Sequence, residues 1–428
     1  MSEAGRLAGE PELVSGSTSL GLGALTLDWA QQLAGHSDQA NALTVAYLTR
    51  AHQTAAAEIA GWMIEAGMQV EIDAVGNVVG RYVSSNPAAK TLLTGSHFDT
   101  VKNGGKYDGR LGILLPIAVV KRLHDHGIRL PFHLEVIAFA EEEGLRYRSS
   151  FLASSALVGA FDLSSLDSVD EDGVSMRDAM RAAGLPGTEE AIRALRRDPA
   201  RIAGFIEVHI EQGPVLLDRG LPLGVVTSIA GGVRMSAKIE GQASHAGTTP
   251  MTMRRDAAAA AAEMILAIES RCAQAPTLVG TVGQIDVPNG ATNVVPGRCE
   301  FSIDIRAGDD RTRDEAVADV MRVCEAIAKR RGVALSFERT MTVACAPCAP
   351  ALMDLLAESL ERVGAGHFRL PSGAGHDAMM MARITNACML FVRCGNSGIS
   401  HNPLETVVVE DVDLAGMVFL DFLRNFRA

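Results

Sequence analysis

Four apolar runs along the chain end in clusters of charged and polar residues. Helical patterns lie between these runs, and the clearest of them extends from Leu111 to Asp125. Runs of this length are typical of buried strands, and their alternation with helices indicates an α/β fold with a parallel-type mixed sheet and helices on both faces. The runs cover residues 90–94, 133–140, 204–208 and 387–392.

Side chains that bind divalent metals follow each run. They are histidines and carboxylates, and one aspartate lies in a glycine-rich turn just before the Leu111 helix. Because the carboxyl ends of parallel strands share one edge of a sheet, where α/β proteins bind ligands, we expect these side chains in one site. One carboxylate could bridge two ions there. The predicted set is His97, Asp108, Glu142 or Glu143, His209 and His401, with Asp99 placed to orient His97 or to bind metal itself.

Each of these signals alone has an ordinary structural explanation. A run of glutamates after a strand, such as residues 141–143, usually forms a solvated loop, and a single histidine at a strand end is more often a hydrogen-bonded structural residue. The coincidence of metal ligands at four separate strand ends favours a metal site. Histidine and carboxylate ligands suit zinc and manganese, and also cobalt or nickel, so the residues do not select the ion.

The residues between about 225 and 343 follow a different pattern. Strands and two long helices alternate there in the order β-α-β-β-α-β, which is typical of a small ferredoxin-like α+β domain. Since His209 precedes this block and His401 follows it, we expect a domain inserted into a catalytic domain of residues 23–224 and 344–428. The strands are predicted at 233–240, 277–287, 299–307 and 333–343, and the helices at 255–272 and, capped by Asp309, at 309–331.

Composition and charge limit the partners and the location. The chain has 428 residues, of which 47% are hydrophobic, and this suffices for two domains with sizeable cores. Its formal charge of −12 disfavours nucleic acid and anionic membranes as partners. No apolar run reaches 18 residues and the N-terminus lacks a signal pattern, so we expect a cytoplasmic protein with a mobile tail at residues 1–22. The scattered cysteines, Cys345 and Cys348 included, are expected to stay reduced.

The inserted domain carries candidate residues of its own. His245 lies in a polar, glycine-containing loop, and Asn293 lies in another. Arg306 follows Ser302 and Asp304 on the polar face of one predicted strand, where its guanidinium could hold a carboxylate through two hydrogen bonds. A second domain that closes over a metal site can exclude water and complete that site.

Beyond these local patterns, the chain resembles the metal-dependent aminoacylase/carboxypeptidase (M20) superfamily. The resemblance runs from about residue 40 to the C-terminus and is to the amidase branch of allantoate amidohydrolases, N-carbamoyl-L-amino acid hydrolases and β-ureidopropionases. It is carried by the segments GSHFDT, GGKYDG, EEEGLRY, EVHIEQGP, SHAGTTPM, NVVPG, SGAGHDA and GISHNPLE. Within the branch, GKYDGRLGI, FLASSALVGA and MLFVRC followed by GISH are most similar to allantoate amidohydrolases.

The resemblance implies a dinuclear centre with two divalent ions per subunit, zinc or manganese in the first place. Asp108 bridges the two ions in this assignment. His97 and His209 complete the coordination of one ion, and Glu143 and His401 complete that of the other.

The resemblance also implies roles for residues that are not ligands. Glu142 is the general base, and Asp99 orients His97. His245 reaches the site of a partner subunit and stabilises the oxyanion, which implies a homodimer through the inserted domain. The chain departs from the branch at Gly231-Gly232-Val233, where relatives carry Gln or Arg, and this departure bears on substrate specificity. The implied substrate-binding residues are Gln212, Asn293, Arg306, Gly375 and His376.

These residues together predict a hydrolase that cleaves a non-peptide C–N bond, that of a ureido group in a small anionic substrate. Allantoate is the favoured substrate because the loops near the predicted site are small and polar, and its products would be ureidoglycine, ammonia and carbon dioxide. An N-carbamoyl-L-amino acid hydrolase or a β-ureidopropionase would use the same ligands. A peptidase is disfavoured because peptidase relatives tend to use a carboxylate at the position of His209, and an inactive metal-binding scaffold is disfavoured because Glu142 is present.

Overall fold

The computed structural model describes residues 20–366 and 368–428, and these divide into two compact units. The first unit contains the described residues up to Val226, together with Cys348–Leu370 and His376–Ala428. The second unit contains Thr227–Pro347 and the short segment Pro371–Gly375, which the sequence pattern did not assign to it. The catalytic role expected for one part, and the lid and dimerisation roles expected for the other, stay predictions.

The tail expected at residues 1–22 lies mostly outside the described residues. Its last residues are described and belong to the fold. The Leu20 N–H donates to the Asp413 carboxylate (3.0 Å), and helix α1 starts at Leu22, whose side chain is buried. Leu20 and Leu22 therefore belong to the fold, although they precede the boundary at residue 23 that the composition suggested.

A mixed sheet forms the centre of the first unit, and its short strand β14 and the last residues of β6 and β15 fall within the second unit. Its strand order is β1-β2-β4-β3-β5-β16-β6, and β14 and β15 also pair with β6. The four central strands are parallel neighbours, whereas the outer strands run antiparallel. This arrangement confirms the predicted α/β class with a mixed sheet. The strands are β1 (Gln69–Ile72), β2 (Val78–Tyr82), β3 (Thr91–His97), β4 (His133–Phe139), β5 (Ile202–Ile210), β6 (Leu223–Ile229), β14 (Ala346–Pro347), β15 (Arg369–Ser372) and β16 (Ala387–Val392).

The four central strands are the four apolar runs of the sequence. β4 and β16 match the predicted runs closely, whereas β3 and β5 extend further towards their carboxyl ends than predicted. The residues that end β3 are polar or glycine, yet all are buried, and the Ser96 hydroxyl donates to the Glu207 carboxylate (2.7 Å) on β5. Strand pairing therefore continues past the apolar run and carries His97 to the last position of β3.

Helices cover this sheet. The predicted helix at 111–125 is confirmed as α3, which packs on β3, β4 and β5 and is buried along most of its length. α1 and α12 pack on α3, so that these three helices share one apolar core. The α-helices of the first unit are α1 (Leu22–Leu33), α2 (Arg50–Glu65), α3 (Leu111–Asp125), α4 (Leu152–Leu157), α5 (Met176–Ala182), α6 (Glu189–Arg193), α7 (Val215–Asp218), α10 (Pro350–Val363), α11 (Asp377–Met381) and α12 (Val409–Asn425).

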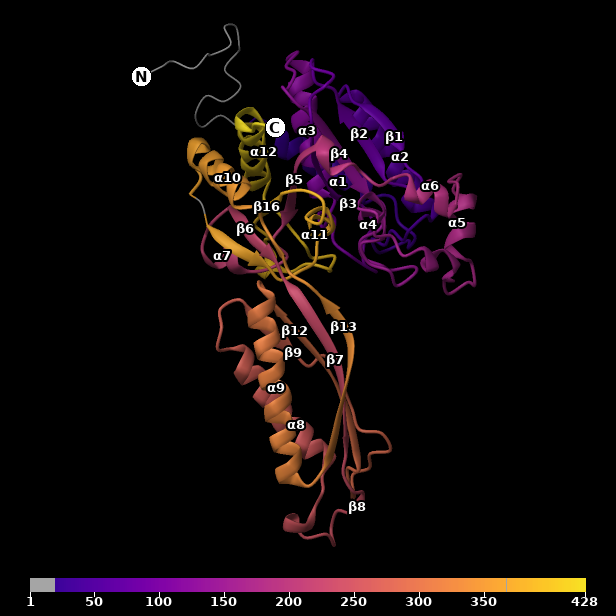
Figure 1. The fold of residues 1–428 in the computed structure, drawn as a ribbon, viewed down its shortest axis with the longest axis vertical. Coiled ribbons are helices and arrows are strands. Elements are labelled where there is room, and N and C mark those ends of the chain that lie inside the picture. Colours follow the sequence, from indigo (N-terminus) through magenta and orange to yellow (C-terminus); the bar gives the residue numbers. More distant parts are fainter. Residues whose placement is uncertain (1–19, 367) are drawn as a thin grey trace. The chain divides into compact units, whose positions relative to one another are not determined.

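The second unit is a separate antiparallel sheet with two long helices packed on it (Figure 1). Its main elements are β7 (Gly231–Glu240), α8 (Ala257–Cys272), β9 (Leu278–Thr281), β10 (Ile285–Asp286), β12 (Arg298–Ala307), α9 (Asp310–Arg331) and β13 (Ala334–Val343). The elements follow the predicted β-α-β-β-α-β order, and the strands lie in the sheet as β13-β7-β12, with β9 and β10 both on the far side of β12. This is the split βαβ pattern that the sequence indicated.

The cap of α9 follows the prediction, and several boundaries in this unit differ from it. The Asp309 carboxylate accepts the Thr312 N–H (2.8 Å), as predicted, but α8 begins after Asp256 rather than at residue 255. The strand expected at 277–287 is broken into β9 and β10. β7 begins at Gly231, two residues before the predicted start at Val233, and a small unpredicted sheet joins β8 (Ser244–His245) to β11 (Val294–Val295).

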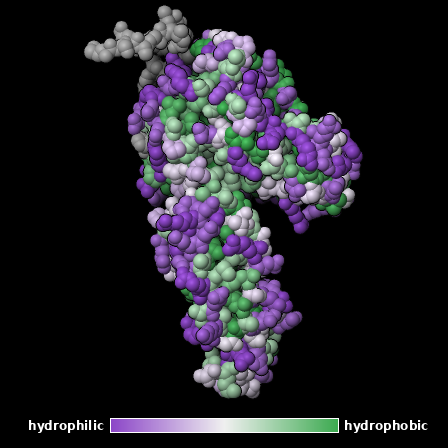
Figure 2. Space-filling model, in the orientation of Figure 1, coloured by the Kyte–Doolittle hydropathy of each residue, from purple (hydrophilic) through white to green (hydrophobic). Residues whose placement is uncertain are grey.

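The outward side of α9 is charged. On the face drawn in Figure 2, the surface over this helix is mainly hydrophilic, and exposed residues such as Arg311, Glu315 and Arg322 account for this. Its opposite side contributes Val317, Val320 and other apolar residues to a core shared with α8, β7 and β12. Among the helices in the part of the chain that the structure describes, none combines the length and the apolar content that a membrane span requires.

Candidate metal centre

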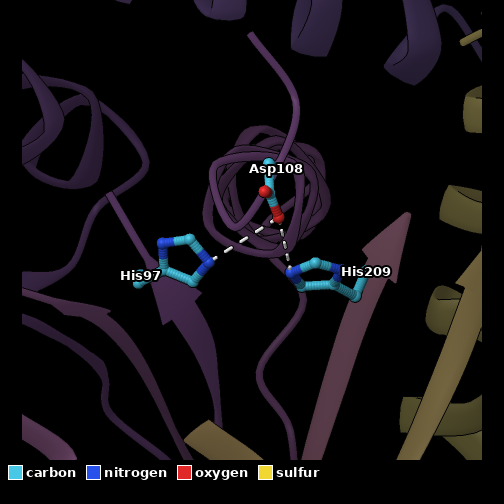
Figure 3. Close-up of side chains that lie close together, drawn as sticks. All are labelled: His97, Asp108 and His209. Carbon is cyan, nitrogen blue, oxygen red and sulfur yellow. Dashed lines mark ion pairs between the residues drawn. The ribbon is translucent and has the colours of Figure 1, made fainter. Parts of the chain in front are cut away.

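The carboxyl ends of β3 and β5 place two histidines on either side of one aspartate (Figure 3). The Asp108 Oδ1 atom lies 3.8 Å from His97 Nε2 and 3.4 Å from His209 Nε2. Each of the three residues offers a ligand atom within 4.8 Å of the others, and all three are buried. A divalent ion bound between these atoms would have two imidazole ligands and one carboxylate ligand, a set that suits zinc or manganese.

A second group of ligand atoms shares Asp108. His401 Nε2 lies 3.1 Å from Asp108 Oδ2 and 3.5 Å from Glu143 Oε1. The ligand atoms of Asp108, Glu143 and His401 again lie within 4.8 Å of one another. Since Asp108 presents one carboxylate oxygen to each group, its position is that of a bridging ligand between two ions.

Asp99 fixes both the first histidine and the glutamates. The His97 Nδ1 atom donates to the Asp99 carbonyl (3.2 Å) and lies 3.4 Å from the Asp99 carboxylate. The same carboxylate accepts the N–H groups of Glu142 and Glu143, each at 3.1 Å. Asp99 therefore ties the turn that follows β4 to the end of β3.

The three consecutive glutamates are buried or nearly so, which excludes the solvated loop that such a run usually forms. Glu142 Oε and the ligand atoms of His97 and Glu143 lie within 4.8 Å of one another. Neither carboxylate oxygen of Glu141 has a hydrogen-bond partner. Burial raises the pKa of Glu143 to about 7, and it raises the pKa of Glu142 well above its usual range. A nearby cation would favour the ionised carboxylates and offset this burial.

The hydrogen bonds of His209 select the ring tautomer that a metal ligand needs. The His209 Nδ1 atom donates to the Ile210 carbonyl (2.8 Å), and its Nε2 atom accepts the Gly109 N–H (3.1 Å), so Nε2 carries the lone pair. Burial lowers the pKa of His209 to about 4, and its ring is therefore neutral. A backbone carbonyl on the far nitrogen is a common way to orient a metal-bound histidine. The donor set therefore fits a pair of divalent ions.

Asp108 owes its position to a turn that only glycine can complete. Gly109 has φ +67°, and a Cβ atom there would lie 2.5 Å from the His97 ring. On the other side, Glu405 Oε1 accepts the N–H groups of Tyr107 (2.9 Å) and Asp108 (3.1 Å). The second carboxylate oxygen of Glu405 accepts the Ser400 hydroxyl (2.8 Å). The sequence analysis gave no role to Glu405, although it stands in the quoted segment GISHNPLE, which also contains His401.

Glu405→Gln should weaken metal binding by about tenfold or more, because charge-assisted hydrogen bonds of about 1.5–3 kcal/mol hold the Asp108 backbone. Competition of the protein with a chromogenic chelator measures this affinity. Glu358→Gln, the same change at an exposed position of α10, is the matched control and should leave the affinity unchanged. An unchanged affinity in Glu405→Gln would show that the Asp108 turn is held without it.

Of the expected substrate residues, Gln212 and His376 lie at this centre. The Gln212 Nε2 atom donates to Asp108 Oδ1 (2.9 Å), and its Oε1 atom is buried without a hydrogen-bond partner. The His376 ring lies edge-on to the His209 ring, with 4.4 Å between their centroids. Glu207, which the sequence analysis missed, groups with these two histidines. Its signal was available, since it stands two positions before His209 on the same face of β5.

The other expected substrate residues belong to the second unit. His245 is exposed on β8, opposite Val294 on β11, and the Ala246 N–H donates to the Asn293 carbonyl (2.9 Å), so His245 and Asn293 are close neighbours. Arg306 lies on β12, in the five-stranded sheet, whereas β8 and β11 form a separate two-stranded sheet. Gly375 ends the segment Pro371–Gly375 of this unit.

Comparison with known proteins agrees with this centre. The model of peptidase family M20/M25/M40 matches residues 93–425. The chain is 40% identical to an allantoate deiminase of Arabidopsis thaliana over 91% of this chain and 79% of the relative. It is 41% identical to an N-carbamoyl-L-amino acid amidohydrolase of Geobacillus stearothermophilus over 82% of this chain and 86% of the relative.

Solved structures show the same fold. A hydantoinase/carbamoylase family amidase from Burkholderia multivorans is 31% identical and has a TM-score of 0.87, covering 94% of this chain and 97% of that chain. The family and the buried His, Asp and Glu groups both point to metal binding. The chain belongs to peptidase family M20/M25/M40, in its allantoate deiminase and N-carbamoyl-L-amino acid amidohydrolase branch, and is a hydrolase that acts on C–N bonds.

Proposed function

We propose that this hydrolase uses two divalent ions to cleave a ureido C–N bond in a small carboxylated substrate, with allantoate as the preferred substrate. The observation that carries the proposal is the pair of ligand groups that share Asp108. Its relatives by sequence include enzymes named for allantoate and for N-carbamoyl-L-amino acids, both of which contain a ureido group beside a carboxylate.

Two ions, zinc or manganese, would be held by His97, Asp108 and His209 and by Asp108, Glu143 and His401. Ions bound there supply Lewis acidity, which lowers the pKa of water and polarises a carbonyl. Cobalt or nickel would suit the same ligands.

Glu142 is the proposed proton carrier. Its carboxylate lies beside His97 and Glu143 in a buried position, and it is not needed to complete either ligand group around Asp108. It takes a proton from the attacking water, which adds to the ureido carbonyl carbon, and returns that proton to the leaving nitrogen as the C–N bond breaks. The leaving nitrogen departs as ammonia, and the carbamate that remains then loses carbon dioxide as its own C–N bond breaks, which leaves ureidoglycine.

The remaining site residues are proposed to orient the substrate. Gln212 and His376 lie at the metal centre and can donate to or accept from a ureido group. Arg306 and Asn293 would bind the substrate carboxylate. Gly375 would contribute to substrate binding as well. His245 would stabilise the oxyanion in the site of a second subunit, through a homodimer of the second unit. The exposure of His245 supports this role because its ring is accessible to a partner.

The preference for allantoate is tested with a substrate panel. Allantoate carries two ureido groups, so its pocket needs polar groups on two sides, and polar pockets strongly reject analogues that lack a partner group. We expect kcat/KM for allantoate to exceed that for N-carbamoyl-L-methionine or N-carbamoyl-β-alanine by about a hundredfold or more. Ammonia release from metal-loaded protein is the measurement.

The second candidate is an N-carbamoyl-L-amino acid amidohydrolase, favoured by the relative from Geobacillus stearothermophilus at 41% identity. Equal or reversed preference in the panel would establish this candidate, or a β-ureidopropionase if N-carbamoyl-β-alanine is best. Either outcome would leave the metal centre and the role of Glu142 as they are.

A further inference from the structure

The second unit presents a charged network on the open face of its sheet. Along β12, residues alternate between the apolar core and this face, so that Ser302, Asp304 and Arg306 share the open side. Asp304 lies directly opposite Arg234 of β7 in the strand register. All these residues border a cavity of about 920 Å³ on this face. This face of the sheet therefore forms a recess that these polar and charged side chains line.

Asp304 is bonded by two arginines at once. Its carboxylate accepts the Nε–H of Arg306 (3.0 Å) and an Nη2–H of the same guanidinium (3.0 Å). It also accepts the Nε–H of Arg234 (2.9 Å). The Arg306 Nη1 atom donates to the Gly373 carbonyl (3.0 Å). These contacts fix the Nε/Nη2 edge of the Arg306 guanidinium through Asp304 and its Nη1 atom through Gly373.

The bonds leave a defined part of Arg306 available. Each terminal nitrogen of a guanidinium has two N–H groups, and Nη1 and Nη2 each use one in the contacts with Gly373 and Asp304. One N–H on each terminal nitrogen remains, and each can donate to an oxygen of a carboxylate. Gly232 lies opposite Arg306 in the register, and a Cβ atom at Gly232 would lie 3.6 Å from the arginine stem, an ordinary van der Waals distance.

The charges of the network do not cancel. A pair of Arg306 and Asp304 alone would be neutral and would attract an anion weakly. Arg234 adds a second positive charge on the other side of Asp304, so the network keeps one net positive charge. In a chain with a formal charge of −12, this local cation matters for the capture of an anionic substrate.

We propose that Asp304 is a positioning residue for Arg306, and that Arg234 offsets the charge of Asp304 so that Arg306 can attract a substrate carboxylate. The proposal rests on the proposed function, because it takes Arg306 as the carboxylate-binding residue. Asp304 determines which N–H groups of Arg306 face the substrate. Arg234 acts through its charge and does not touch the substrate.

Kinetics of two single variants and their double variant test the proposal. Asp304→Asn should raise KM for allantoate about tenfold, with a smaller change in kcat, since a fixed charged hydrogen bond is lost. Arg234→Met should raise KM about threefold at low salt, as for an exposed ion pair, and this increase should fade at about 0.5 M salt because the effect is purely electrostatic. At about 0.5 M salt, where the charge of Arg234 is screened, the double variant should have the same KM as Asp304→Asn alone.

The control is Glu300→Gln, which removes an acid that borders the same cavity on the same strand and does not contact Arg306. Its KM should stay at the wild-type value. An unchanged KM in both single variants, or a KM of the double variant at about 0.5 M salt that is higher than that of Asp304→Asn, would overturn the proposal. A purely structural pair between β7 and β12 would change thermal stability in the variants and leave the salt dependence of KM unchanged.

A measurement without turnover separates this proposal from the proposed function. The Nε–H of Arg306 should give a slowly exchanging NMR signal, assigned by its loss in Arg306→Lys, and Asp304→Asn should make it exchange rapidly. If wild-type protein hydrolyses no ureido substrate but this signal behaves as expected, the proposed function fails and the positioning of Arg306 stands. If wild-type protein is active and the signal is unchanged in Asp304→Asn, the positioning proposal is overturned.

Discussion

Glu142→Gln should lower kcat by about 10²–10⁴-fold while the protein keeps its metal, because a general base contributes about that much to the rate. The carboxamide has nearly the same shape but cannot accept and return a proton. Glu142 is buried and lies beside His97 and Glu143, so a change of shape would disturb the ligands, and the isosteric substitution avoids this. Steady-state ammonia release and elemental analysis on the same sample measure the two effects.

The neighbouring residue provides the matched comparison. Glu143→Gln makes the same chemical change one position later, at a carboxylate 3.5 Å from His401 Nε2. It should lower the metal content as well as kcat, since Glu143 is one of the three ligands, with Asp108 and His401, that would hold one ion. If Glu142→Gln empties the site while Glu143→Gln keeps the metal, the roles of base and ligand are reversed.

The metal centre could be expected from the sequence because strand periodicity and parallel pairing together determine where strand ends meet. The four apolar runs became parallel neighbours in the order β4-β3-β5-β16, which brings their carboxyl ends to one edge. This rule alone was enough to predict that His97 and His209 lie at the same edge of the sheet. The apolar pattern could not show that β3 continues through Ser96 to His97, since those residues are polar and join the sheet by pairing with Ala138 and Phe139 of β4.

Contacts between residues distant in sequence explain what the sequence did not predict. Glu405 bonds the backbone of Tyr107 and Asp108, and these partners have no common local pattern with it. Gln212 reaches Asp108 in the same way. Such contacts depend on how loops fold over the strand ends, and loop conformation follows from tertiary packing more than from periodicity.

In the second unit too, the sequence predicted the elements but not the contacts between residues distant in sequence. Its order of helices and strands followed from the alternation of apolar and polar positions, and the Asp309 cap followed from residue type. The alternation also placed Asp304 and Arg306 on one face of their strand. It could not pair Asp304 with Arg234, because that contact depends on the register between β12 and β7.

Removal of metal should abolish turnover and lower the thermal stability of the protein. The centre buries the carboxylates of Asp99, Asp108 and Glu142, and burial of charges without a cation is costly. A ligand present at about 1,000 times its Kd stabilises a folded protein by about 4 kcal/mol, so chelated protein should melt several degrees lower than metal-loaded protein. Calorimetry before and after dialysis against a chelator, followed by return of zinc or manganese, measures the loss and its reversal.

The control for this comparison is the Asp108→Asn variant, dialysed against the chelator in the same way. Asp108 belongs to both ligand groups, so Asp108→Asn should bind neither ion tightly and should show no gain in melting temperature when metal is returned. A full gain in this variant would place the stabilising ions elsewhere in the chain.

The dinuclear mechanism is tested most directly by titration of metal into metal-free protein while ammonia release from allantoate is recorded. The shared position of Asp108 predicts that activity rises from near zero and levels off at two ions per chain. Full turnover in protein shown by elemental analysis to contain no metal, or a maximum reached at one ion per chain, would contradict it.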